Sequence, residues 1–413
     1  MKKNRFIIDN AGKIFAQVSN AGSPNTFRIS VELADTIDPD ILKQATNDIL
    51  PRFPTFKTKI TTHFFWQYLS DNDKVAEVYP LEPNMRAYFN PKENNLFMFR
   101  VSFRDNTITV DVHHSLSDGY GGMIFLQSLV YRYLELSGVD VKPCKDIKTL
   151  DQSATQEELE DSYTTHYTRK NDKAAAAGHA YRFKVEGDIV DPGICTRTVK
   201  WDSGAILKLA REHNSTITEY LTAVYAYSIY KTYLEGREDT TVLPVMICIP
   251  YDLRRLFQSQ TLKNFSTYIK TKYHFEKDST FEMVLEEIKK QVKEENDKDF
   301  LAARTNSTVK LERWFINRWA PFFIKRPIMK YVYNRMSDKA ITASFSNLGV
   351  AQFPESIAEH IKGCEINFFA AGISICAITH NGILRMTFNK NFTDEGIEQQ
   401  FIQHLAEQGI QPL

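Results

Sequence analysis

Two adjacent histidines, His113 and His114, are the residues whose types and surroundings suit chemistry best. They close an alternating apolar and polar stretch from Thr107, which predicts a β-strand that ends at His114. Side chains alternate between the two faces of a strand, so His114 points with the apolar residues into the interior while His113 points away. Imidazole titrates near neutral pH, and at a strand end beside a loop His114 is well placed to act as a general base.

An acid and a glycine follow the histidines, with Asp118 four residues after His114 and Gly119 directly behind it. A lone histidine on an apolar face is more often a buried core residue, but these neighbours favour a catalytic role. The stretch from His113 to Gly119 resembles the His-His-x-x-x-Asp-Gly signature of the condensation-domain and alcohol acetyltransferase branch of the CoA-dependent acyltransferase superfamily. The resemblance implies that His114 is the catalytic base, that Asp118 organises the site through an ion pair, and that Gly119 keeps the substrate channel open.

One candidate partner for Asp118 comes from the segment after the first predicted helix. Residues 50–58 resemble the family's Arg-His-x-x-Leu-Arg-Thr block, whose second arginine corresponds to Lys57. The resemblance therefore implies an ion pair between Lys57 and Asp118. Lysine lacks the two-pronged geometry with which arginine binds a carboxylate.

A second candidate partner is Arg254. Residues 249–255 resemble the family's Asp-Leu-Arg-Arg block, and Asn264 with Phe265 resembles the Asn-Phe pair downstream of it. An apolar strand that ends in an acid and two arginines needs partners for those charges. Arg254 is thus the alternative ion-pair partner of Asp118.

A third motif supplies candidates for binding the oxyanion of an acyl-transfer reaction. The segment from Ser344 to Gly349 resembles the Ser-Asn-x-Gly block of the alcohol acetyltransferases. Ser344 and Ser346 share one face of a predicted strand, and the resemblance implies that one of these hydroxyls, or the amide of Asn347, donates to the oxyanion. A polar strand end with an asparagine turn is the structural alternative.

The length of 413 residues exceeds the usual size of a single core and predicts two lobes. We predict a first lobe over 1–165, a polar crossing over 166–194 and a second lobe over 195–413. The family resemblance implies an α/β fold of two chloramphenicol acetyltransferase-like sandwiches that form a V-shaped pseudo-dimer around a cleft. Predicted strands cover 27–33, 57–68, 97–114 with a turn at 105–106, 195–199, 242–249, 341–348 and 366–388, and predicted helices cover 39–50 behind an Asp38 cap, 121–136, 203–213, 218–234, 281–295 and 396–408.

The lobes read as degenerate copies of one unit. A shift of 276 positions carries apolar and acidic residues onto like residues: Ile108, Val110, Val112, Leu116 and Asp118 fall on Leu384, Met386, Phe388, Phe392 and Asp394. At the histidine positions the second copy has Asn389 and Lys390. One catalytic centre per chain is therefore expected.

Composition excludes several classes of protein. With 51 basic and 51 acidic residues, the chain has no overall charge to attract nucleic acid. The five cysteines are scattered without metal-site spacing, and adjacent histidines do not have the spacing of a zinc hydrolase motif, so no metal is expected. Without a signal peptide or a long apolar run, we expect a cytoplasmic protein. Because both lobes are in one chain, a monomer would have a complete cleft.

Residues 313–335 belong to none of the motifs described above. From Arg313 to Arg335, basic residues alternate with tryptophan, phenylalanine and tyrosine. Such a stretch suits a membrane surface or the border of a lipophilic substrate site. Packing as surface helices on the second lobe is the favoured interpretation.

The predicted function is transfer of an acyl group from a thioester to an alcohol or an amine. The thioester is expected to be acyl-CoA, or else a phosphopantetheine thioester on a carrier protein, and it serves as a co-substrate rather than as a bound cofactor. A non-catalytic condensation-like binding module is the hypothesis from a different class. The intact histidine motif argues against it.

Overall fold

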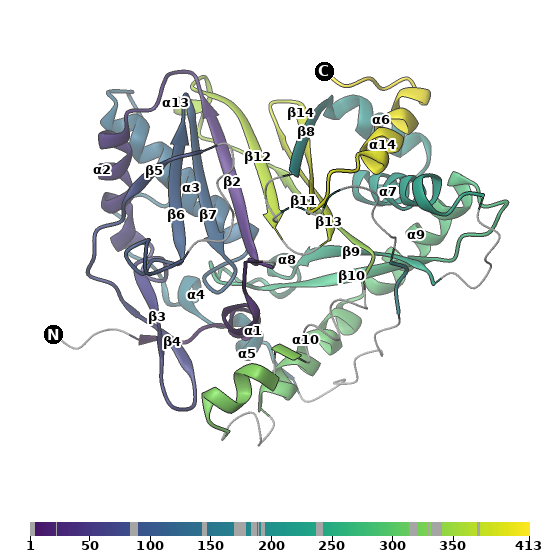
Figure 1. Cartoon of the computed structure of the whole chain (residues 1–413). Helices are drawn as coiled ribbons and strands as arrows, with labels where there is room; N and C mark the ends of the chain where they lie inside the picture. The colour runs from purple at the N-terminus through teal and green to yellow at the C-terminus, as the bar shows by residue number, and fades with distance from the viewer. Residues whose placement is uncertain are drawn as a thin grey trace.

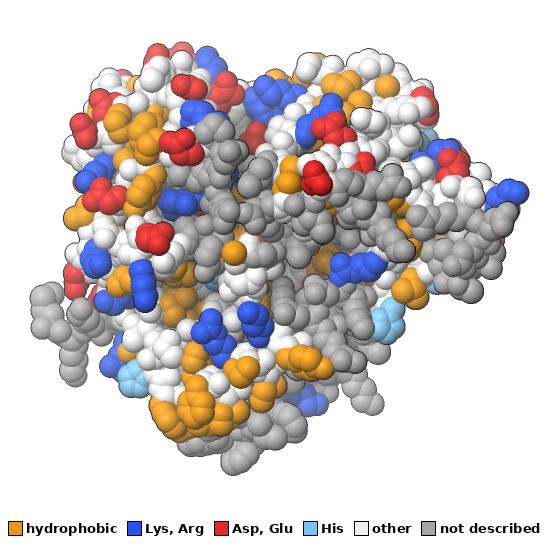
Figure 2. All heavy atoms as spheres, viewed as in Figure 1, with side chains coloured by type: hydrophobic (Ala, Val, Ile, Leu, Met, Phe, Trp, Pro, Cys, Tyr) orange, Lys and Arg blue, Asp and Glu red, His pale blue; other side chains and the backbone are white. Residues whose placement is uncertain are grey.

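The computed structural model describes residues 5–21, 23–82, 90–142, 147–168, 179–182, 188, 190, 195–236, 243–313, 320–328, 330–331, 341–369 and 372–413. Figure 1 shows two lobes, each built on a sheet with helices packed against it, that open away from each other in a V. The predicted crossing at 166–194 lies largely outside the described residues, and the lobe boundaries at 165 and 195 stay a prediction. On the face in Figure 2, acidic and basic side chains are interspersed over the upper part, as the balanced composition predicts.

The first lobe is a five-stranded sheet in the order β12-β2-β7-β6-β5. Its helices α2 (Pro39–Ile49) and α3 (Gly119–Leu136) pack their apolar sides against a core that includes Phe53, Phe56 and Phe125. As predicted, Asp38 caps α2, and its side chain accepts hydrogen bonds from two backbone amides of the first turn. The strands are β2 (Thr26–Leu33), β5 (Val78–Pro80), β6 (Phe99–Arg104), β7 (Thr107–His113) and β12 (Ile361–Phe369), with β1 (Arg5–Phe6), β3 (Thr58–Thr62) and β4 (Gln67–Asp71) forming a separate small sheet.

The second lobe is a six-stranded sheet in the order β10-β9-β11-β13-β14-β8. Its core joins the sheet to helices α7 (Ile217–Tyr233), α9 (Phe281–Glu295) and α14 (Gly396–Glu407). The predicted helix over 281–295 is therefore confirmed. The strands of this sheet are β8 (Cys195–Asp202), β9 (Val245–Asp252), β10 (Ser266–Tyr273), β11 (Ala343–Val350), β13 (Ile373–His380) and β14 (Ile383–Lys390).

The described residues also form helices beyond those named so far. They include α1 (Asn10–Val18), α4 (Gln156–Leu159), α5 (Ser162–Thr165), α6 (Ser203–Glu212), α8 (Arg254–Phe257), α10 (Lys298–Arg313) and α13 (Glu355–Ala358), with a 3₁₀ turn, Leu50–Arg52, after α2.

One strand passes from the second half of the chain into the first lobe. β12 pairs antiparallel with β2, with Ile366 opposite Ile29, and forms the edge of the first sheet. Because β12 is followed directly by β13 of the second sheet, the two sheets are joined through a short connection. This crossover holds the inner edges of the two lobes together.

The repeated unit is visible in both lobes. β7 leads into α3, and β14 leads into α14. Asp118 accepts a hydrogen bond from the amide of Gly121 at the start of α3, and Asp394 accepts one from the amide of Gly396 at the start of α14. Lys390, at a position that corresponds to a histidine, forms a buried ion pair with Glu398 instead.

Candidate active site

A cavity of about 1470 Å³ lies between the lobes. Both lobes line it, from α1 and the start of α3 on one side to β9, β10 and β11 on the other. Most of the predicted site residues lie in its wall: His114, Asp118, Gly119, Arg254, Ser344, Ser346 and Asn347. His113 and Lys57 are absent from the lining residues that the structure describes.

His114 lies one residue beyond the end of β7. The strand was predicted to include it, but the chain turns there, with the amide of Leu116 bonded to the carbonyl of His113. The imidazole packs between three aromatic rings, stacked on Phe15 at 4.7 Å and in contact with Phe27 and Phe368. Burial lowers the pKa of His114, against the opposing effects of nearby Asn264 and Asp118. The ring is therefore neutral near pH 7, as a general base must be.

Asn264 orients the imidazole of His114. Its Oδ1 lies 3.1 Å from His114 Nδ1. Its Nδ2 donates to Asp9 Oδ2 and to the carbonyl of His114, each at 2.8 Å. Since the carbonyl of His114 can only accept, Nδ2 must face it, and the amide oxygen of Asn264 must face the ring. Nδ1 of His114 then carries the proton, and Nε2 keeps its lone pair.

Asp9 stands behind Asn264 as the second member of this chain of hydrogen bonds. It is fully buried and caps α1, accepting from the amide of Gly12 at 2.7 Å. Burial, with a smaller effect from Asp161, raises the pKa of Asp9 to about 7. Sequence reasoning noted Asn264 as part of a motif but gave it no role. It missed Asp9, whose local signal is only that of a helix cap.

The raised pKa of Asp9 makes a testable prediction about stability. The native state favours the protonated carboxyl, so it loses stability relative to the unfolded chain as pH rises from 3.8 to about 7. Asp9→Asn removes the charge and keeps an acceptor oxygen. Relative to the wild type, its free energy of unfolding should therefore rise over this range, by up to about 4 kcal/mol in total.

Urea unfolding at pH 5 and pH 8 measures this rise for Asp9→Asn. Asp202→Asn is the matched control, because Asp202 caps α6 in the same way from the surface. The control should show no such rise. A difference between Asp9→Asn and wild type that is the same at both pH values would contradict the prediction.

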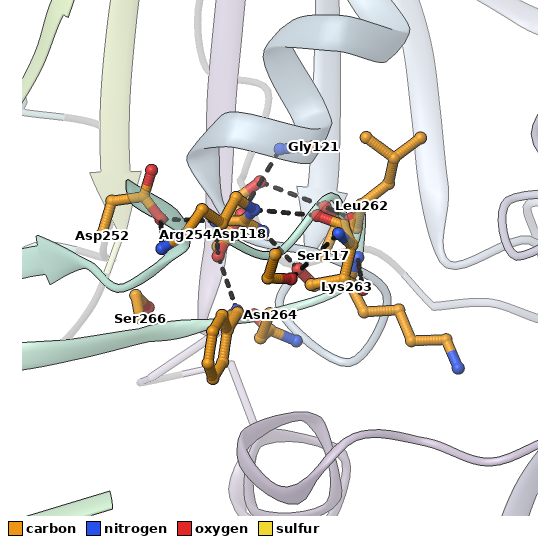
Figure 3. Close-up of polar contacts among 12 residues, drawn as sticks. Ser117, Asp118, Gly121, Asp252, Arg254, Leu262, Lys263, Asn264 and Ser266 are labelled. Atoms are coloured by element: carbon orange, nitrogen blue, oxygen red, sulfur yellow. Dashed lines mark hydrogen bonds and ion pairs between the residues drawn. The ribbon is translucent and has the colours of Figure 1, made fainter. Parts of the chain in front are cut away.

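Asp118 forms its ion pair with Arg254, and Figure 3 shows the two side chains facing each other. The guanidinium donates from Nη1 to Asp118 Oδ2 at 3.0 Å and from Nη2 to Oδ1 at 2.9 Å. The amide of Phe265 donates to the same carboxylate at 2.9 Å. Because Asp118 belongs to the first lobe and Arg254 to the second, this buried pair ties the lobes together beside the cavity.

The predicted pairing of Lys57 with Asp118 is wrong. Phe53 and Phe56 are buried in the first core, and the turn that places them there leaves Lys57 exposed. The same segment does provide a buried cation, Arg52, which binds both oxygens of Glu158 at 2.7 and 2.9 Å. A bidentate arginine, not the lysine, is the buried charge of this segment.

His113 is held by hydrogen bonds within the protein at both ring nitrogens. The backbone amide of Ser115 donates to its Nδ1 at 3.1 Å, and its Nε2 lies 2.9 Å from the hydroxyl of Ser19. Burial, with a smaller effect from the neighbouring His114, lowers the pKa of His113 to about 3. The ring thus links the end of β7 to the residue after α1 and has no lone pair directed at the cavity.

The oxyanion candidates lie on β11. Ser344 and Ser346 line the cavity, while Phe345 between them is fully buried. Asn347 donates to the hydroxyl of Thr218 at 3.2 Å and accepts from the amide of Gly349 at 3.0 Å. Because the Asn347 amide is held by these bonds, the two serine hydroxyls are the better candidates.

Gly119 lies where α3 approaches β11. A Cβ atom at this position would come within 3.0 Å of Leu348 Cδ1, another residue of the cavity wall. A larger side chain would push into the space between the lobes. This placement agrees with the channel role that the motif implies.

Known proteins match this chain in structure and not in sequence. No family model and no curated protein sequence matches the chain. Solved structures do match over nearly the whole length, among them polyketide synthase associated protein 5 from Mycobacterium tuberculosis, with a TM-score of 0.61, 11% identity and coverage of 98% of this chain and 100% of that one. The chain has the fold of these structures, which include condensation domains. The predicted α/β fold of the acyltransferase type is confirmed.

Two further solved structures that match are an acetyltransferase and a condensation domain in complex with C8-CoA. Trichothecene 15-O-acetyltransferase from Fusarium sporotrichioides matches with a TM-score of 0.59 and 12% identity, over 98% of this chain and 94% of its own. The starter condensation domain of rhizomide synthetase, in complex with C8-CoA, matches with a TM-score of 0.60 and 14% identity, over 99% and 96%. The TM-scores show that the fold is shared, and identities of 12% and 14% do not establish an activity for this chain.

Within the described ranges, no three His, Cys, Asp or Glu side chains come together as a group that could hold a metal ion. Nor does any described helix combine the length and the apolar character needed to cross a bilayer.

Proposed function

We propose that this protein transfers an acyl group from a thioester, most simply acyl-CoA, to an alcohol or an amine. The observation that carries the proposal is the arrangement around His114. A neutral imidazole in the cavity wall has its Nδ1 proton held by Asn264, so Nε2 is the ring nitrogen whose lone pair can accept a proton. The fold shared with an acetyltransferase and with a CoA-bound condensation domain supports the same class of reaction.

His114 acts as the general base. As the acceptor attacks the thioester carbonyl, its hydroxyl or amine proton passes to Nε2, and Asn264 stabilises the resulting imidazolium through the Nδ1 hydrogen bond. Asp9 fixes Asn264 and acts through it. Both are positioning residues, since neither touches the substrates.

Ser344 or Ser346 donates to the oxyanion that forms on the carbonyl oxygen. Collapse of the tetrahedral intermediate breaks the carbon–sulfur bond, and the proton held by His114 goes to the departing thiolate. Both substrates meet in the cavity, so the reaction needs no covalent acyl-enzyme. Much of the acceleration comes from holding the two reactants together.

Free acyl-CoA and an acylated carrier protein are the two candidate donors, and both deliver the same phosphopantetheine thioester. The match to a condensation domain that binds C8-CoA favours acyl-CoA. A non-catalytic binding module would retain the fold but would have no need for an oriented base.

Release of free thiol tests the proposal. Purified protein is incubated with a panel of acyl-CoAs and with pooled alcohols and amines, and the thiol is followed with a chromogenic disulfide. We expect release that depends on the acceptor, and mass spectrometry should find the acylated acceptor.

If thiol release requires a carrier-loaded donor, the proposed acyl-transfer reaction stands, and the donor is an acylated carrier protein rather than free acyl-CoA. Absence of transfer with either kind of donor would contradict the proposal and leave the binding module.

A further inference from the structure

We propose that the end of the molecule that lies lowest in Figure 2 binds the surface of an anionic lipid bilayer through an exposed apolar tip. The tip consists of two segments, the turn between β3 and β4 and the helical residues 322–331, of which residue 329 is not described. Its exposed apolar side chains are Phe64, Phe65, Phe323, Ile324, Ile328 and Tyr331. The inference is independent of the acyl-transfer proposal, because none of these residues lines the cavity.

The tip concentrates apolar surface that is otherwise scattered. Phe64, Phe323 and Tyr331 are 60%, 67% and 62% exposed, values far above those of core aromatic residues. The other large exposed apolar residues of the described chain occur one at a time along the sequence. Figure 2 shows the orange side chains gathered at the lower end of the molecule. A contiguous exposed apolar patch marks an interaction surface.

Specific contacts build the tip from segments that are far apart in the sequence. The amide of Phe322 donates to the carbonyl of Phe64 at 2.7 Å, and the rings of Phe64 and Phe323 meet edge to face. Lys325 is buried, with its ammonium 3.4 Å from the centre of the Trp66 ring and 3.0 Å from the carbonyl of Phe65. These bonds hold the two segments in register and direct the apolar side chains outward.

The charges of the tip fit an anionic lipid surface. Neither residues 58–68 nor residues 320–331 contain an acidic residue. Arg326 and Lys330 are exposed beside the apolar side chains, and Lys59 is half-buried in β3. Aromatic and aliphatic side chains bordered by cations are the pattern of helices that lie in the bilayer interface, where the apolar part enters the acyl region and the cations meet the headgroups.

A bilayer suits this shape better than a second protein. Figure 2 shows hydrophobic side chains on the outer surface at this end of the molecule, and exposed cations lie beside them in residues 320–331. The proposed contact differs from the surface-packing role favoured for residues 313–335 on sequence alone. Part of that stretch, 314–319 and 332–335, lies outside the described residues.

Flotation with lipid vesicles tests the proposal on the full chain. Vesicles of phosphatidylcholine containing roughly a third phosphatidylserine are compared with pure phosphatidylcholine, at low and at high salt. We expect the wild type to float with the anionic vesicles at low salt. Phe323→Ser/Ile328→Ser should lower the bound fraction about tenfold or more. Arg326→Gln/Lys330→Gln should weaken binding mainly to the anionic vesicles.

Val75→Ser/Met283→Ser is the matched control, because it removes two exposed apolar side chains far from the tip in sequence. It should bind like the wild type, and all variants should show the wild-type melting curve. Failure of the wild type to float at low salt, or equal flotation of the Phe323→Ser/Ile328→Ser variant, would overturn the proposal. So would a dimer in solution that this variant disrupts, since the tip would then be a protein interface.

Discussion

His114→Ala is expected to lower kcat for acyl transfer by about 10² to 10⁴-fold, the usual contribution of a general base. The alanine leaves the cavity and the thioester site in place, so KM for the donor should change little. Steady-state thiol release at saturating donor and acceptor measures the loss. The remaining rate would come from the positioning of the two substrates.

Two other histidines serve as comparisons for His114→Ala. His113→Ala should lower stability more than turnover, because His113 links β7 to Ser19 and does not line the cavity. His274→Ala removes an exposed imidazole after β10 and should leave both unchanged. Equal turnover of His114→Ala and wild type would rule out the proposed mechanism.

Asp118→Ala should lower the free energy of unfolding by about 3 kcal/mol or more, because it leaves the guanidinium of Arg254 buried without its main partner. The same change removes the acceptor for two backbone amides, those of Gly121 and Phe265. Urea unfolding measures the loss. Asp118→Ala/Arg254→Met should recover part of it, since no unpaired charge then remains.

Asp252→Ala is the matched control for Asp118→Ala. Both carboxylates bind the same guanidinium at 2.9 Å, but the side chain of Asp252 is 42% exposed and that of Asp118 only 7%. Water screens an exposed pair, so Asp252→Ala should cost about 1 kcal/mol or less. Equal losses for the two variants would show that burial does not set the strength of this contact.

Local sequence patterns predicted most of the elements. Period-two alternation indicated β7, the Asp38-Pro39 pair indicated the start of α2, and the bounds predicted for α9 are those observed. Such signals need only neighbouring residues, because backbone geometry and helix caps act over one or two turns. The same is true of the histidine motif, whose residues lie within a single turn between β7 and α3.

The amino-acid sequence by itself determined most of the strands and helices, though not α1, β10 or α10, together with the histidine motif and the balance of charge. Only the tertiary structure decided that Arg254 rather than Lys57 binds Asp118, that Asn264 and Asp9 orient His114, and that β12 completes the first sheet. Each of these contacts joins residues more than 130 positions apart, as with Asp118 and Arg254 at a separation of 136. The packing of the two lobes determines these partners, and the spacing of the residues along the chain does not predict them.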